Sequence, residues 1–113
     1  MNLGIIGSDS FSDYHLLKSA IERHFTQLDA LILCGSTRTD QLASRYAREK
    51  DVQTIIIEPL PGPEAKEILS QRAENIARFA DTIIAFWNGD CRIIRYTLHQ
   101  AALKGVGVIW VDV

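Results

Sequence analysis

Five short apolar runs, each ending at a turn or a polar cluster, alternate along this chain with four stretches of roughly helical length. The runs span residues Leu3–Ser8, Ala30–Ser36, Thr54–Pro59, Thr82–Gly89 and Gly107–Val113. Alternation of strand-length and helix-length segments is typical of an open parallel sheet with helices on both faces. Apolar runs without alternation, such as ILIL and TIII, are expected of strands that are covered on both sides.

The sequence therefore predicts an α/β fold: a single-domain, Rossmann-like three-layer sandwich over residues 1–113, with a five-stranded parallel sheet and four helices. We expect strands at Leu3–Gly7, up to Cys34, Thr54–Glu58, Thr82–Trp87 and Val106–Val113. We expect helices at about Asp13–Phe25, from about Asp40, at Glu64–Ala80 and at about Cys91–Lys104, the last ended by Gly105. The proline-rich segment Pro59–Pro63 is predicted to be a rigid extended crossover. Two strand orders, 3-2-1-4-5 and 2-1-3-4-5, fit this pattern.

Composition excludes several classes of protein. A chain of 113 residues that is 47% hydrophobic and 23% charged suits one compact domain. Its net charge of −2 offers no basic patch for duplex nucleic acid, and its apolar runs are far shorter than a membrane span of about 20 residues. No signal-peptide pattern precedes the first run, and two cysteines make no disulfide framework, so we expect reduced thiols and a cytoplasmic location.

Binding sites in such sheets lie at the carboxyl ends of the strands, where polar residues follow four of the five runs here. Gly7, Ser8 and Asp9 follow the first run. A glycine there lets backbone amides approach a ligand, and a serine hydroxyl can donate to a phosphate. The alternative interpretation is an ordinary polar turn.

The second run leads into a predicted helix through Gly35, Ser36, Thr37, Arg38 and Asp40. Small hydroxyl residues and a guanidinium at a helix N-terminus favour an anion pocket. The charge of Asp40 also suits a helix N-terminus. Alternatively, Ser36 or Thr39 serves only as an N-cap and Arg38 is a solvated charge.

The fourth run is followed by a third set of candidate ligand contacts, Trp87, Gly89 and Arg92. Trp87 is predicted to stack on a base or line a ribose, and Arg92 to meet a phosphate. Alternatively, Phe86 and Trp87 are core aromatics, an interpretation that suits Phe86 better. We identify no catalytic residue, and the three histidines lack metal-ligand spacing. The one metal site that the sequence suggests is a Mg²⁺ ion that bridges Asp9 and a bound phosphate.

Nearly the whole chain resembles the SLOG superfamily, and within it the small YspA-like family of bacterial and phage proteins. The resemblance rests on IIGSDSFSDY at Ile5–Tyr14, on CGSTRTD with Gly35 and Asp40, on RAENIARFAD with Arg72, Ala80 and Asp81, and on AFWNG at Ala85–Gly89. The superfamily includes cytokinin-activating phosphoribohydrolases and the DNA-processing protein A. The resemblance implies a Rossmann-like fold, a nucleotide-derived ligand and a charge contribution from Arg72.

The phosphate loops of that family are only partly kept. Cys34 and Arg38 stand where the family has glycines, and the glycine that opens its last helix is absent from the segment Cys91–Ile94. The phosphoribohydrolases carry a glutamate just inside that helix, where this chain has Arg95-Tyr96-Thr97. The resemblance therefore implies the fold and argues against inherited hydrolase activity.

The sequence as a whole favours a binding module for a nucleotide or nucleotide-derived small molecule. Two alternatives stay open: a degenerate SLOG-fold protein that acts through protein–protein contacts, and a nucleoside-monophosphate phosphoribohydrolase in which Asp9, Asp40 or Asp90 replaces the missing glutamate. We also expect a homo-oligomer, with an interface on the third or fourth predicted helix.

Overall fold

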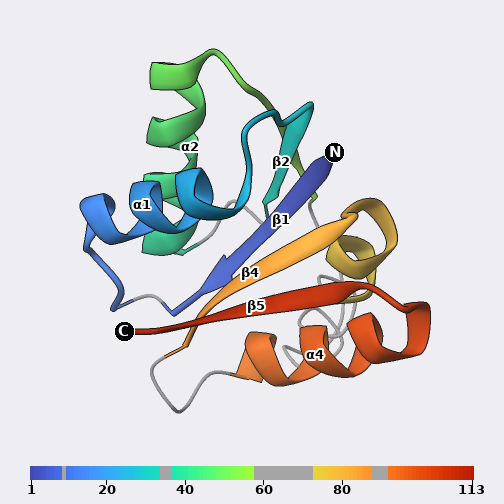
Figure 1. Cartoon of the computed structure of the whole chain (residues 1–113). Coiled ribbons are helices and arrows are strands. Elements are labelled where there is room, and N and C mark those ends of the chain that lie inside the picture. Colours follow the sequence, from blue (N-terminus) through green and yellow to red (C-terminus); the bar gives the residue numbers. More distant parts are fainter. Residues whose placement is uncertain (9, 34–36, 58–72, 88–91) are drawn as a thin grey trace.

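The computed structural model describes residues 1–8, 10–33, 37–57, 73–87 and 92–113, without the side chains of residues 92 and 93 (Figure 1). Its strands are β1 (Asn2–Gly7), β2 (Ala30–Leu33), β3 (Gln53–Ile56), β4 (Thr82–Trp87) and β5 (Gly107–Asp112). Its helices are α1 (Tyr14–His24), α2 (Arg38–Lys50), a helical segment at residues 73–79, and α4 (Arg92–Lys104). The predicted crossover Pro59–Pro63 and most of the predicted helix Glu64–Ala80 lie outside the described residues.

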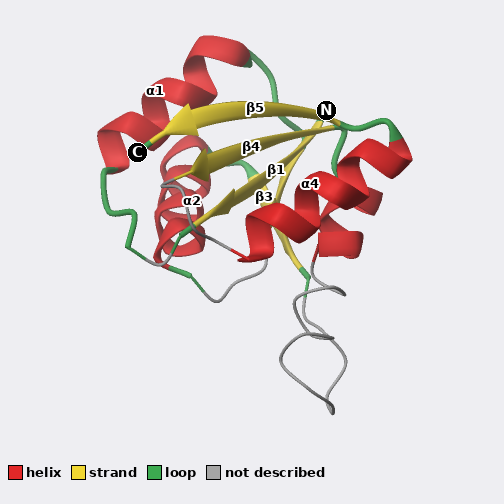
Figure 2. Ribbon diagram, turned by 90° about the horizontal axis from the view of Figure 1, so that it is seen from below, coloured by secondary structure: helices red, strands yellow, loops and turns green. Residues whose placement is uncertain are grey.

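The strands form one parallel sheet in the order β3-β2-β1-β4-β5, which decides between the two predicted orders. β1 lies at the centre and pairs with β2 on one side and β4 on the other. Helices α1 and α2 cover one face, and α4 with the 73–79 segment covers the other (Figure 2). The predicted α/β, Rossmann-like three-layer arrangement is confirmed.

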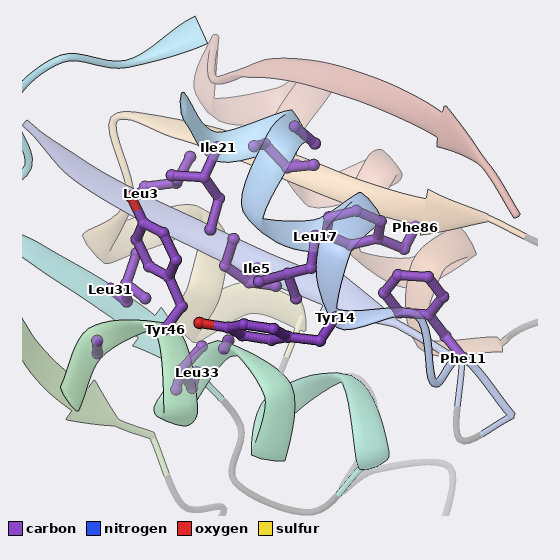
Figure 3. Packing of buried hydrophobic residues seen from close by; sticks show 14 residues of the cluster. Leu3, Ile5, Phe11, Tyr14, Leu17, Ile21, Leu31, Leu33, Tyr46 and Phe86 are labelled. Carbon is purple, nitrogen blue, oxygen red and sulfur yellow. The ribbon is translucent and has the colours of Figure 1, made fainter. Parts of the chain in front are cut away.

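Alternate residues of β1 enter two different halves of the core. Leu3 and Ile5 are fully buried against α1 and α2, among the side chains that Figure 3 labels. Ile6 points to the other face and joins the cluster that contains Ile76 and Ile94. Both faces of the central strand are therefore buried, as its unbroken apolar sequence requires.

The edge strands depart from the prediction that strands are covered on both sides. In β2 all four residues are buried, but in β3 Ile55 and Ile56 remain 39% and 51% exposed. On β5 at the other edge, Trp110 is 47% exposed. Both strands stand at an edge of the sheet, where a strand lacks one neighbour.

Capping residues locate the helix ends more accurately than the hydrophobic periodicity of the sequence does. α1 begins after Asp13, whose Oδ1 accepts a hydrogen bond from the Leu16 amide at 3.1 Å. α2 begins at Arg38 rather than at about Asp40, because Thr37 is its N-cap. α4 ends before Gly105, as predicted, and the φ of 72° at this glycine suits a helix C-terminus.

A polar contact joins α1 to α2 at the margin of the core. The Tyr14 hydroxyl donates to Glu49 Oε2, and Arg45 Nε donates to Glu49 Oε1 at 3.1 Å. The Arg45 guanidinium also lies 4.0 Å from the centre of the Tyr14 ring. Burial, reinforced by the hydrogen bond to Glu49, raises the pKa of Tyr14 to about 12.

This raised pKa predicts a loss of stability at high pH. The folded protein keeps Tyr14 protonated where the unfolded chain loses the proton, so the contribution is complete below pH 10.0 and disappears by about pH 12. We therefore expect Tyr14→Phe to unfold at a lower temperature than the wild type at pH 8, and the difference to shrink between these limits. Melting temperatures of both proteins across this range test it. A constant difference would show that Tyr14 titrates normally.

Candidate functional site

The helices that follow β1 and β4 along the chain lie on opposite faces of the sheet. β1 and β4 are neighbours, with Gly7 in register with Phe86. The chain passes from β1 to α1 on one face and from β4 to α4 on the other (Figure 1). In an open parallel sheet, this divergence creates the crevice in which ligands bind.

A hollow of about 270 Å³ lies at this edge, on the α1 side of the sheet. Hydroxyl groups, one carboxylate and apolar groups line it, from Ser8, Ser10, Phe11, Ser12, Asp13, Leu16 and Val113. Ser8 Oγ and Ser10 Oγ lie 3.1 Å apart. The lining can therefore offer hydroxyl donors and acceptors beside an apolar wall, a combination typical of small-molecule sites.

An aromatic stack holds the loop that carries these hydroxyls. Phe11 is 5% exposed and Phe86 of β4 is fully buried. Their rings are nearly parallel, with centres 4.7 Å apart (Figure 3). Phe86 is thus a core residue, and the stack ties the β1–α1 connection to the neighbouring strand.

The N-terminus of α2 is closed by its own side chains. Asp40 Oδ2 accepts from the Thr37 amide at 3.1 Å, while Thr37 Oγ1 accepts from the Asp40 amide at 3.2 Å. This reciprocal capping box satisfies two backbone donors. Asp40 is only 4% exposed, so its carboxylate has a capping role, and the N-cap is Thr37 rather than Ser36 or Thr39.

Thr39 connects the start of α2 to the end of β1. Its side chain is fully buried, and its Oγ1 donates to the Ser8 carbonyl at 2.8 Å. A Cβ atom on Gly7 would lie 2.4 Å from Thr39 Oγ1 and 2.7 Å from its Cγ2. The glycine is therefore needed to admit Thr39, which is a different reason from the predicted approach of a ligand.

Trp87 lies at the end of β4, with its half-buried side chain packed against the α4 side of the core. Its ring meets Trp110 edge to face, with centres 5.3 Å apart and planes at 90°. Because the hollow opens on the α1 side, Trp87 does not line it. A ligand would contact both the hollow and Trp87 only by crossing the edge of the sheet.

The structure thus places part of the predicted site together. Gly7 and Ser8 at the end of β1 contact Thr39 at the start of α2. Thr37, Arg38 and Asp40 lie at the same helix end, where Arg38 is exposed. Five predicted residues lie outside the described part: Asp9, Gly35, Ser36, Arg72 and Gly89. Arg92 begins α4, but its side chain is not described.

Sequence reasoning missed the main lining of the hollow. Ser10, Ser12 and Asp13 follow Ser8 within the run SDSFSD, and their density of short polar side chains was the available signal. For Thr39 the sequence predicts only an alternative role as N-cap. Its contact with Ser8 depends on the crossover between strands, and no local pattern reports such a contact.

A second hollow, of about 540 Å³, lies at the opposite end of the sheet. Its lining includes Glu22 and Lys50, which form an ion pair at 3.4 Å, and Tyr46. These residues come from the C-terminal halves of α1 and α2. This end carries the amino ends of the strands, where parallel sheets seldom bind ligands, so we place the site at the carboxyl edge despite the larger volume here.

Neither a cluster of metal-ligating side chains among the described residues nor a match to a known protein assigns a further role to this site. Within the described residues, no three or more His, Cys, Asp or Glu side chains gather closely enough to hold a metal ion. The described helices include none that is long and apolar enough to cross a bilayer. Comparison with protein-family models and with curated proteins found no match for this sequence.

The contact between Gly7 and Thr39 predicts that one methyl group added at position 7 strongly lowers the stability of the fold. We expect Gly7→Ala to lower the free energy of unfolding by about 1–3 kcal/mol, because Thr39 must move away from Ser8. Gly107→Ala is the matched control, since a Cβ there meets nothing within 4 Å. In a Thr39→Ala background Gly7→Ala should cost less. Urea unfolding measures all four variants, and equal losses for the two single glycine variants would contradict this packing.

Proposed function

We propose that this protein is a binding module for a nucleotide or nucleotide-derived small molecule, held at the carboxyl edge of the sheet. The observation that carries the proposal is the hydroxyl-lined hollow of about 270 Å³ beside the connection from β1 to α1, at the carboxyl edge of the sheet. This volume is near the lower end of known ligand pockets, so it suits the sugar or base end of the ligand.

Different residues suit the sugar and the phosphate of the proposed ligand. Ser10, Ser12 and Asp13 can hydrogen-bond sugar hydroxyls, and Phe11 supplies an apolar wall. Asp13 would repel a phosphate from the α1 N-terminus. The phosphate would instead extend toward the exposed guanidinium of Arg38 in the first turn of α2.

The SLOG resemblance is part of this proposal. The strand order β3-β2-β1-β4-β5 and the position of Trp87 at the edge are compatible with it. We extend the proposal to a cytoplasmic setting and a homodimer. Hydrolase activity has less support, because the first turn of α4 contains no acidic residue.

A second candidate is a degenerate member that acts through protein contacts. The observation in its favour is that Asp13 and Asp40 cap α1 and α2, so the chain's own carboxylates occupy positions that an anion would take. The space beside Gly7 is also filled, by Thr39.

A thermal-shift screen with AMP, ADP, cyclic nucleotides, NAD, ADP-ribose and adenosine tests the proposal. A ligand at 100 times its Kd should add about 2.7 kcal/mol to the stability of the folded protein. Arg38→Ala should weaken binding of a phosphorylated ligand about 10-fold or more, since it removes a charge-assisted contact.

Arg48→Ala is the matched control, because Arg48 is an exposed arginine near the other end of the same helix. It should bind as the wild type does, and adenosine should bind both variants equally. A flat screen would overturn the proposal and favour the interaction protein. Equal weakening by the two substitutions would place the phosphate elsewhere.

A further inference from the structure

Strand β5 presents a free edge on the side away from β4. In the sheet of described strands it stands last in the order, with β4 as its neighbour. Its sequence, GVIWVD, contains neither proline nor lysine, the residues that commonly protect an edge strand from pairing. At six residues it is also longer than β3, the four-residue strand at the other edge.

The backbone groups that point away from β4 can be assigned. The Val113 amide donates to the Trp87 carbonyl at 3.0 Å, so the groups of this residue face β4. Because a strand directs its backbone groups to alternate sides, Val108, Trp110 and Asp112 direct theirs outward. This row of donors and acceptors is ready to pair with another strand.

The side chain of Trp110 on this strand packs against a neighbouring aromatic ring. Trp110 is 47% exposed, yet its ring meets Trp87 edge to face at 5.3 Å. A large exposed aromatic that is held by a neighbour loses little conformational entropy when it is covered. Tryptophan is also among the residues most enriched at protein interfaces.

We propose that β5 pairs antiparallel with β5 of a second copy, about a two-fold axis at Trp110, so that the two sheets become one continuous sheet. In this register Trp110 lies opposite its own symmetry mate and Val108 lies opposite Asp112. These are the residues with outward backbone groups, so each of them finds a partner. Opposite residues share a face, so both Trp87–Trp110 pairs meet on the α4 side.

Self-pairing is favoured over an unrelated strand because the edge is complementary to itself. A two-fold contact uses the same patch twice, and the Trp110-centred register pairs the outward groups along the length of β5. It also brings acidic Asp112 toward the end of the second copy at which α4 finishes with Lys104. This interface differs from the one predicted from the sequence, which lies on the third or fourth helix. Leu103 of α4, an apolar residue that is 68% exposed, allows the two interfaces to be compared by mutation.

Light scattering after size-exclusion chromatography, from about 1 μM to about 1 mM protein, tests the pairing. We expect the mass to rise with concentration toward twice 12.7 kDa. Both tryptophans of the chain belong to the aromatic pair, so the emission maximum should move to shorter wavelength over the same range. Trp110→Lys should stay monomeric, whereas Leu103→Lys should dimerise as the wild type does.

Circular dichroism checks that each variant is folded, and Val108→Pro gives a second test because it removes an outward donor without removing a bond to β4. Hydrogen exchange of the wild type needs no variant: amides of Val108, Trp110 and Asp112 should gain protection with concentration. A monomer at every concentration would overturn the proposal. So would amides whose exchange is independent of concentration, or a dimer that survives Trp110→Lys and is lost in Leu103→Lys.

Discussion

The backbone of β1 pairs with a strand on each side, and this pairing holds the sheet together. β1 bonds to β2 along one edge and to β4 along the other, although these strands are far apart in sequence. Every donor and acceptor of a buried strand must be paired, so β1 can lie only between two neighbours. The two halves of the core, and the divergence of the chain at the carboxyl edge, follow from this position.

The contact between Thr39 and the end of β1 links that scaffold to the candidate site. Thr39 fills the space left by Gly7 and bonds to the Ser8 carbonyl, which fixes the start of α2 against β1. The Phe11–Phe86 stack fixes the loop on the other side of Ser8. Contacts to the scaffold at Ser8 and Phe11 therefore lie close to the hydroxyls that line the hollow.

Charge is distributed unevenly around the same edge. The carboxylates of Asp13 and Asp40 cap the two helices of one face, and Arg38 is exposed in the first turn of α2. A ligand that combines hydroxyls with a phosphate fits this mixture better than an isolated anion, because the carboxylates accept from hydroxyls and repel phosphate oxygens. The exposed Trp110 on β5 meets Trp87 on the other face, so the proposed ligand site and the proposed contact of Trp110 with a second copy lie on different faces of the sheet.

The fold class and the described strands and helices can be predicted from the sequence, because turn residues bound each apolar run and the periodicity changes between runs. The strand Thr82–Trp87 and the helix end before Gly105 were predicted as they stand. The strand order, the exposure of β3 and β5, and the contact of Gly7 with Thr39 depend instead on how the whole chain packs. Local patterns report which residues can form a strand or a cap, but pairing and close approach join residues about 30 or more positions apart, and these are set by the packing of the whole chain.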